Sequence, residues 1–345
     1  MRWFVLRRLA LAPLVLLGMT CITFFVSQLI PIDPVAAYLG GRGAAQSDAA
    51  EQAIIDALNA RWGWDKPIPE RYWIYLTNLL QGDMGESSHS ARAVSTDLAN
   101  VLPPTIELVV AALVVALVFG IPLGVFAAAR RGGVWDALFK VVSTLAISVP
   151  VFWLAIVGFM VFYGRLGWAA GPGQLDIFTR PPPEVTGMVT VDSILAGRWD
   201  ALFDTLHHLA FPALVLGLVI GFYFARVVRS EMVDALESDY VRTARGKGLR
   251  RRLVLYRHAF RNAVIPVITL SGLAFGSLLT GIIVVERVVG WPGLGQYAFT
   301  AATRLDLNAL SGVVLVISLA YVLANLTVDL LYTVADPRVR DGMRS

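Results

Sequence analysis

The chain has 345 residues, of which 57% are hydrophobic and 16% charged, and its formal net charge is +4. Soluble domains average about 45–50% apolar and about 25% charged residues, so this composition excludes an ordinary soluble protein as well as collagen-like, disordered and disulfide-rich chains. The single cysteine, Cys21, can form no disulfide within the chain.

The apolar residues fall into blocks, each long enough for a helix of ~20 residues to cross a bilayer. Hydrocarbon offers backbone N–H and C=O groups no partner outside the segment itself, so each block is predicted to be helical. The expected fold class is an all-α polytopic membrane protein with six transmembrane helices. The blocks run over about 9–30, 104–129, 137–163, 209–229, 263–285 and 309–333.

The first block resembles a secretory signal in one respect, because Arg2, Arg7 and Arg8 precede it. Its apolar run extends to Ile30, however, beyond the ~7–15 residues of the apolar region of a signal, and no A-x-A-like cleavage site follows. We therefore expect a retained helix.

Lysine and arginine concentrate in some of the connecting pieces, and aspartate and glutamate in the others. The positive-inside rule places the basic pieces, and with them both chain termini, in the cytoplasm. The basic balance therefore reflects membrane orientation, and nucleic-acid binding is not expected because no basic patch lies on a soluble domain. The basic pieces are 1–8, 130–136, 230–262 and 334–345.

On this topology an external segment follows the first helix. Within it, residues 49–62 have the spacing of an amphipathic helix, 71–80 form a second short helix rich in Trp and Tyr, and 82–85 form a turn. The expected organisation is an N-terminus and first helix at 1–30, the external segment at 31–103 and a core of five helices at 104–345.

An external insertion at 165–208 interrupts the core. The run 181–183 consists of three prolines, which break secondary structure, and a short helix is expected at 192–206. His207 and His208 follow, but adjacent side chains on a helix point apart, so no metal site is expected there.

The cytoplasmic loop 230–262 is the most informative part of the chain. A polar, basic helix is predicted at about 234–245, and Gly246 and Gly248 then end it. A helix in mid-loop is typical of a membrane protein that presents a surface to a soluble partner. Further arginines either fix the topology or contact that partner, and the sequence leaves both interpretations open; they are Arg250, Arg251, Arg252, Arg257 and Arg261.

Ionisable residues near membrane depth all lie close to helix ends, and snorkelling explains the basic ones. No central chain of Asp, Glu or His indicates a proton relay. The chain also lacks G-x-x-x-x-G-K-[ST] and H-E-x-x-H, so neither a phosphate-binding loop nor a zinc protease site is predicted. The residues near membrane depth are Glu107, Lys140, Arg226, Arg229 and Asp329.

Arg242, Thr243 and Ala244 followed by Gly248 resemble the EAA motif of ABC-importer permeases, the loop that docks on the ATPase. Arg242 stands where the general motif has Glu, which is similar to the variant of the dipeptide/oligopeptide/nickel permease family. The runs 240–249 and 255–266 resemble that family closely. Further resemblances in chain order are 29–34, 65–67, 82–85, 102–107, 148–153, 286–296 and 329–338.

The resemblance implies a type I ABC-importer permease fold in the inner membrane of a bacterium or archaeon. It implies a second homologous permease, two ATPase subunits that bind ATP and Mg, and an extracytoplasmic binding protein. No cofactor or catalytic residue is expected on this chain. Peptide is the expected substrate; nickel, oligosaccharide or opine remain alternatives. A secondary transporter is the rival class, and the missing intramembrane carboxylates argue against it.

Three groups of residues are the candidate sites. The coupling residues lie at 234–248 and are Tyr240, Arg242, Thr243, Ala244, Arg245, Lys247 and Gly248. Small residues of the third and fifth helices serve either the pore or, more in keeping with their size, helix packing: Ser148, Pro150, Ser271, Gly272, Gly276 and Ser277. The outer loop 286–296 contains a rigid turn with an interfacial tryptophan, and it is either a gate and binding-protein contact or a purely structural re-entrant turn. Its candidate residues are Glu286, Arg287, Gly290, Trp291, Pro292 and Gly293.

Overall fold

The computed structural model describes residues 2–29, 48–63 and 65–335. Over these residues the chain is helical, without a β-strand; one isolated bridge joins Glu86 and Ala93. The family-like run 29–34 lies outside the described residues apart from Leu29, as does the end of the run 329–338. The helices of the N-terminal part are α1 (Arg2–Leu29), α3 (Asp48–Trp62), α4 (Ile68–Leu80), α5 (Val94–Ala129), α6 (Val134–Ser148), α7 (Val151–Phe162) and α8 (Val189–Leu195). Those that follow are α9 (Trp199–Glu237), α10 (Asp239–Gly246), α11 (Arg251–Leu253), the π-helix η1 (Val254–Ala259), α12 (Phe260–Ala263), α13 (Ile265–Gly281), α14 (Ile283–Val289), α15 (Leu294–Thr303) and α16 (Leu307–Ala335).

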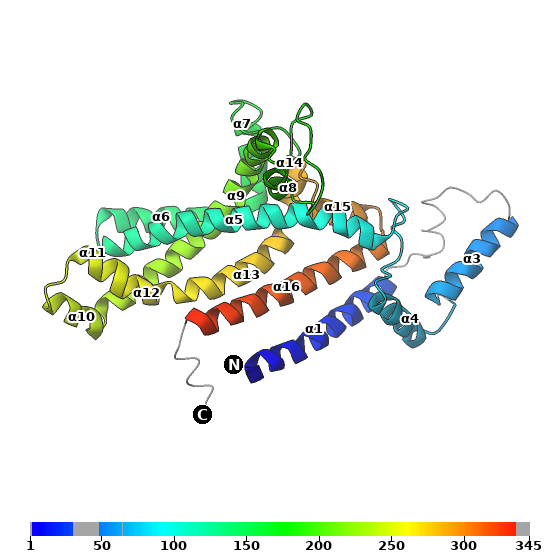
Figure 1. Ribbon diagram of the computed structural model, residues 1–345, viewed down its shortest axis with the longest axis horizontal. Helices are drawn as coiled ribbons and strands as arrows, with labels where there is room; N and C mark the ends of the chain where they lie inside the picture. The colour runs from blue at the N-terminus through cyan, green and yellow to red at the C-terminus, as the bar shows by residue number, and fades with distance from the viewer. Residues whose placement is uncertain (1, 30–47, 64, 336–345) are drawn as a thin grey trace.

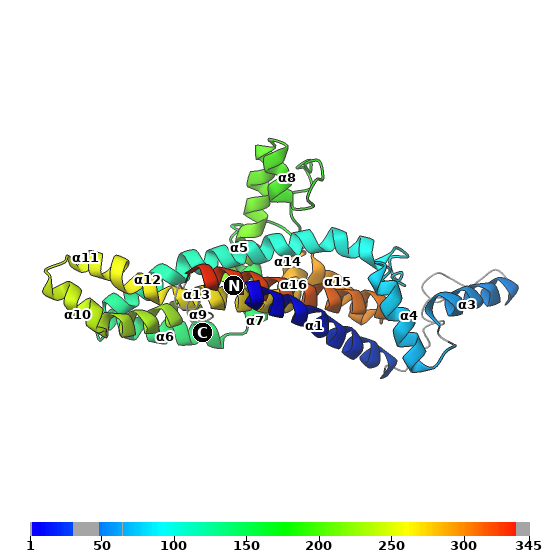
Figure 2. The ribbon, with the colours of Figure 1, turned by 60° about the horizontal axis from the view of Figure 1, so that its bottom comes forward.

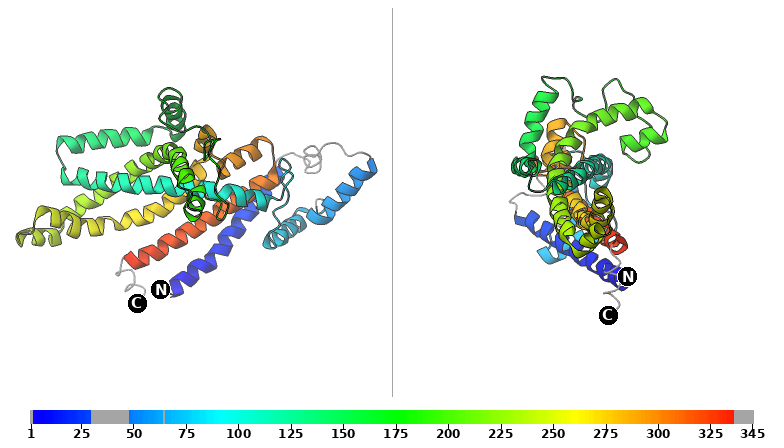
Figure 3. Two further views of the ribbon diagram at one scale, coloured as in Figure 1. Left: turned by 45° about the horizontal axis from the view of Figure 1, so that its top comes forward. Right: turned by 90° about the vertical axis from the view of Figure 1, so that its left-hand side faces the viewer.

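The long helices form an elongated bundle. Helices α10, α11 and α12 gather at one end, while α4 and α15 lie toward the other (Figure 1). Helix α8 and the first turns of α9 stand off the side of the bundle (Figures 2 and 3). The end that carries α10 is the end that the charge distribution assigns to the cytoplasm.

Three helices are long and apolar enough to cross a membrane unbroken, namely α5, α9 and α16 over Leu307–Val328. Two bent pairs, α6 with α7 and α13 with α14, bring the number to five if each pair is one span, and Pro13–Leu29 is a shorter apolar helix. This count refers to the described part of the chain. The apolar blocks of the sequence therefore correspond to helices, although two of them are broken.

The third block is not the single continuous helix that its hydropathy indicates. Helices α6 and α7 meet at a bend of 95°. Pro150 provides no N–H, and its ring disfavours the helical conformation for the residue before it. Val149 accordingly has an extended backbone, with φ −79° and ψ 128°. The fifth block bends by 59° between α13 and α14.

Helices α5 and α9 pack backbone against backbone through glycines on both helices. A Cβ added to Gly217 would lie 2.6 Å from the Ala112 oxygen, and one added to Gly124 would lie 2.6 Å from the Ala225 oxygen. Gly120 and Gly221 face each other in the same seam. Small residues allow such close approach in membranes, so these two helices form one rigid stem.

In the external segment the predicted helices are present as α3 and α4, and the predicted turn is formed by Gly82 and Gly85, with φ of +82° and +83°. The prediction of one helix over 192–206 is wrong, because α8 ends at Leu195 and a second helix, α9, begins at Trp199. Gly197, with φ +65°, separates the two helices, because it has the left-handed conformation that ends a helix.

Candidate functional site

The predicted coupling helix is shorter than the sequence indicated. Residues 234–237 belong to the last turn of α9, and the separate helix α10 begins at Asp239. Ser238 lies between them with ψ 154°, and its hydroxyl donates to the Ala235 carbonyl at 2.5 Å. A single extended residue therefore joins the rigid stem to α10.

The inner face of α10 is buried. Val241 is fully buried and Ala244 is 5% exposed, and both belong to an apolar cluster with Met232 of α9 and with Val254 and Ala259 of η1. Full burial of a valine side chain contributes about 1.5–3 kcal/mol, whereas an exposed ion pair contributes ~0–1 kcal/mol. Packing therefore fixes the position of α10, and its charges are left for other contacts.

The outer face of α10 is polar and exposed. The nearest acid to Arg242 is Asp239, at 3.5 Å, and both side chains are 80% exposed or more. The Thr243 hydroxyl donates to the Asp239 carbonyl of its own helix at 2.9 Å. The exposed residues of this face and the following turn are Tyr240, Arg242, Thr243, Arg245 and Lys247.

Gly248 forms the turn out of α10. Its φ is +75°, which residues with a Cβ adopt at a cost, and no atom lies within 4 Å of an added Cβ. The backbone conformation at this position therefore favours glycine, although the surrounding space would admit a side chain. Gly246, two residues earlier at the end of α10, has neither a positive φ nor a close neighbour.

Polar contacts join the end of α5 to the segment after Gly248 and to the end of α9. The Arg251 guanidinium donates to the Ala129 carbonyl, the last of α5, at 2.6 Å. Arg131 pairs with Glu237 at the end of α9. A cavity of about 560 Å³ lies between these elements. Of the five arginines after α10, Arg251 thus has a structural contact that topology alone does not explain.

The outer loop is mostly buried. The Glu286 carboxylate is fully buried and accepts hydrogen bonds from the Thr105 hydroxyl at 2.6 Å, from the Gly295 N–H at 2.7 Å and from the Gln296 N–H at 3.1 Å. The Thr105 oxygen in turn accepts from the Leu294 N–H at 2.6 Å. This network, which we call the outer lock, joins α5 to α14 and to the first turn of α15.

Trp291 completes the outer lock, and the prediction of an interfacial tryptophan is wrong. The side chain is fully buried, and its indole N–H donates to the Pro104 carbonyl of α5 at 2.8 Å. Gly290 takes the left-handed conformation, and Gly293 leaves no room for a Cβ beside Glu286. The sequence showed an aromatic residue in a turn, but a partner 187 residues away decides its burial.

Two residues of the outer loop remain exposed, Arg287 and Pro292. The Arg287 guanidinium lies 5.3 Å from the centre of the Phe299 ring. These two side chains are the part of the predicted gate that a partner can reach, while Glu286, Trp291 and Gly293 form its frame.

The two glycines of α13 lie in helix packing. Gly272 faces Val328 and Gly276 faces Tyr321, both on α16, and neither has space for a Cβ. The Ser271 hydroxyl donates to a carbonyl of its own helix. Ser277 and Ser148 do the same with theirs, and Pro150 is exposed at the bend between α6 and α7.

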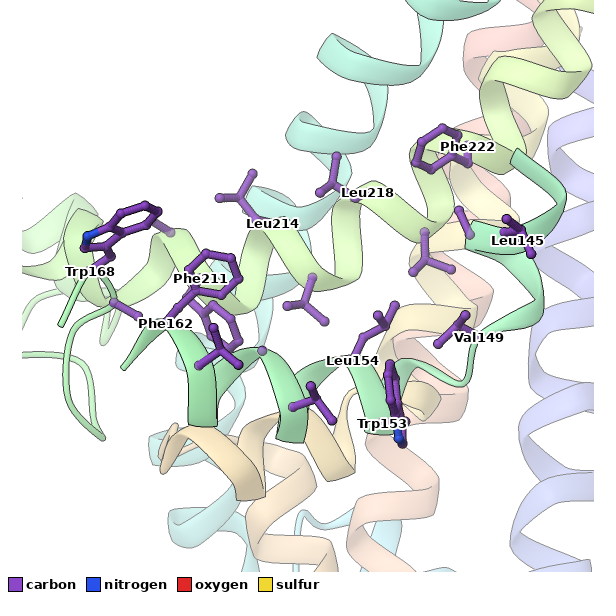
Figure 4. Close-up of a pocket in the computed structure, with 18 of the residues that line it drawn as sticks. Leu145, Val149, Trp153, Leu154, Phe162, Trp168, Phe211, Leu214, Leu218 and Phe222 are labelled. Carbon is purple, nitrogen blue, oxygen red and sulfur yellow. The ribbon is translucent and has the colours of Figure 1, made fainter. Parts of the chain in front are cut away.

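An apolar cavity of about 830 Å³ lies between α6, α7 and α9. Phe162 of α7 and Phe211 of α9 lie beside each other in its lining, with ring centroids 6.3 Å apart (Figure 4). His207 is the one residue of its lining with an ionisable side chain. Such a surface offers few partners for the charged ends of a polar solute.

Comparison with known proteins decides the family. A family model described as the binding-protein-dependent transport system inner membrane component matches residues 120–341, and the model of the N-terminal region of such membrane components matches residues 1–109. This chain belongs to that family. It is a membrane component of a binding-protein-dependent transport system.

The permease is similar over nearly its full length to several curated relatives. It is 40% identical to the probable D,D-dipeptide transport system permease DdpB of Escherichia coli K12, with 95% of each chain covered. It is 39% identical to the di/tripeptide transport system permease DppB of Pseudomonas aeruginosa, with 98% of each covered. It is 36% identical to the glutathione transport system permease GsiC of Pectobacterium atrosepticum, with 99% of each covered.

An ion pair of this permease was missed in the sequence. Arg229, interpreted there as a snorkelling residue, instead donates to Asp136 at 2.6 and 3.0 Å, and Asp136 is 1% exposed. Lys140 lies 3.1 Å from the same carboxylate. The pair joins α6 to α9 toward the end of the bundle that carries α10. Counting both residues as topology charges concealed it.

Among the described residues of this permease, no group of three His, Cys, Asp or Glu side chains could hold a metal ion. His207 contacts the Trp168 carbonyl at 3.1 Å, and His208 contacts the Asp204 carbonyl at 3.0 Å. The two rings therefore serve separate contacts.

Proposed function

We propose that this chain is one of two homologous permease subunits of an ATP-driven importer of dipeptides and oligopeptides. Two ATPase subunits bind ATP and Mg, and a binding protein delivers the peptide at the outer face. The observation that carries the proposal is α10, whose buried apolar face fixes it to the stem while its basic face is exposed. No catalytic residue or cofactor of this chain is required.

Six spans fit this role: α1, α5, α6 with α7, α9, α13 with α14, and α16. Both termini then lie in the cytoplasm together with α10, because the lysines and arginines collect on that side. ATP-driven closure of the ATPases moves α10, and the stem of α5 and α9 carries that movement across the membrane. The coupling residues at 234–248 supply the contact surface.

The pore lies between this permease and its homologous partner. Two observations support this position of the pore. Gly272 and Gly276 pack against α16 and so do not line a pore within the chain. The cavity between α6, α7 and α9 has an apolar lining that suits a polar solute poorly. Rocking of the two halves about a central site gives alternating access. At the outer face, Arg287 and Pro292 are the exposed residues of the outer loop that meet the binding protein.

Reconstitution tests the proposal. Proteoliposomes that contain both permeases and both ATPases should take up a labelled dipeptide only with ATP inside and loaded binding protein outside, and vanadate should stop uptake. Accumulation by this chain alone, or uptake driven by a proton gradient without ATP, would reject it. Competition by unlabelled peptide but not by nickel, oligosaccharide or opine assigns the substrate class.

A further inference from the structure

Glu107 is a buried acid that the transport role described so far does not use. It lies on α5 and is 5% exposed. One carboxylate oxygen accepts from the Thr190 backbone N–H at 2.7 Å, and the other accepts from the Gln174 amide nitrogen at 3.0 Å. Burial of a carboxylate is unfavourable unless it is hydrogen-bonded, and such residues in membrane helices are usually functional. Both donors belong to the external insertion 165–208.

The part of the insertion that Glu107 holds is a preformed unit. The Asp192 carboxylate of α8 accepts from the backbone N–H groups of Val185, Thr186 and Gly187 at 2.8–3.1 Å. A Cβ added to Gly187 would lie 3.0 Å from Pro103 of α5. The turn therefore sits directly against α5, next to the position where Glu107 bonds Thr190.

The same insertion also reaches the outer loop. The Gly173 N–H donates to the Val289 carbonyl at 3.1 Å, and a Cβ added to Gly290 would lie 2.8 Å from Pro172. The insertion therefore bridges α5 and the turn that follows α14. From Glu107, α5 runs without a break to Ala129, where Arg251 of the coupling loop donates.

We propose that Glu107 is a positioning residue that seats the external insertion on α5 and against the Val289–Gly290 turn, so that the outer face responds to the loaded binding protein as one body. The proposal rests on the proposed function, because it presumes a binding protein at this face. It adds a residue that acts through the insertion, because both hydrogen-bond donors to its carboxylate belong to that segment.

The test uses the complete complex in proteoliposomes and measures ATP hydrolysis as loaded binding protein is titrated. Glu107→Leu removes both acceptors, and the binding-protein concentration for half-maximal stimulation should rise about tenfold. Glu107→Gln retains an acceptor for Thr190 and should restore that concentration to within about threefold of wild type. Glu184→Leu, the same change at an exposed acid of the insertion, is the matched control and should leave it unchanged.

Equal half-maximal concentrations for Glu107→Leu and Glu184→Leu would overturn the proposal. So would a lower maximal rate with an unchanged half-maximal concentration, because the seating of the insertion would then not govern the response to the binding protein. If Glu107→Leu does not assemble, Gln174→Leu breaks the same contact from the insertion and must give a shift in the same direction. Stimulation of the wild-type complex by the binding protein tests the proposed function separately.

Discussion

Gly248 offers the sharpest mutational test of the coupling loop. Its φ of +75° lies in the left-handed region, where a Cβ costs roughly 1–2 kcal/mol, and a β-branched side chain is a particularly poor fit. No atom lies within 4 Å of an added Cβ, so the cost of Gly248→Val comes from the backbone alone. A cost of 1–2 kcal/mol lowers the ratio of native to altered turn by about 5–30-fold.

Uptake should fall by up to this factor, because α10 leaves the stem at a different angle when this turn changes. The assay is ATP-dependent uptake of a labelled dipeptide in cells that express the whole system, normalised to the permease in the membrane fraction. Gly246→Val is the matched control, since Gly246 is equally open but has no positive φ. Gly248→Asp, which also adds a negative charge to a basic surface, should abolish uptake while the protein stays inserted. Equal uptake by Gly248→Val and Gly246→Val would refute the reasoning.

Four further outcomes are expected. Asp136→Ala leaves a half-buried arginine unpaired and should destabilise the detergent-solubilised permease by about 3–5 kcal/mol, seen as a lower Tm; an unchanged Tm would exclude a structural ion pair. Thr105→Val deprives the Glu286 carboxylate and the Leu294 N–H of a hydrogen-bond partner, and each loss should lower the stability by about 1–3 kcal/mol. Thr303→Val is the control and should not shift the Tm, because this exposed hydroxyl bonds only within its own helix. Gly276→Leu has no space against α16 and should reduce the folded yield on size-exclusion chromatography, and a normal yield would contradict the packing role. For Asp192, burial would raise the pKa of the carboxyl, but hydrogen bonds from the preceding turn outweigh it and hold the pKa below its ordinary value of 3.8. The ionised Asp192 therefore stabilises the turn fully above about pH 4, and this stabilisation is lost as the pH falls through the lower pKa of the folded state. Proteolysis at 184–188 should accelerate only below about pH 4.

Local signals in the sequence predicted much of the fold. The apolar blocks became helices because hydropathy and backbone satisfaction are properties of each segment by itself. Helices α3 and α4 and the turn at Gly82 and Gly85 were likewise predictable from amphipathic spacing and glycine. The bend at Pro150 had a visible cause, yet the length of the block indicated one helix.

The contacts that define the candidate site were less accessible from the sequence. Glu286 bonds Thr105 across 181 residues, and Arg229 bonds Asp136 across 93, so neither pair leaves a local pattern. The break at Ser238, which separates α10 from α9, depends on how Val241 and Ala244 pack against η1 rather than on a strong helix breaker. Motif spacing indicated the candidate coupling loop, whereas tertiary packing fixes its geometry.

Cross-linking between α10 and an ATPase subunit tests the central claim most directly. Because Cys21 is the only cysteine, Cys21→Ser provides a cysteine-free chain into which Arg242→Cys can be introduced on the exposed face of α10. In the assembled complex, a short bifunctional reagent should join this position to an ATPase subunit, with a yield that changes when ATP is trapped by vanadate. A cross-link yield of zero in complexes that still transport peptide, or labelling of this cysteine by a membrane-impermeant maleimide from the outer side, would contradict the account.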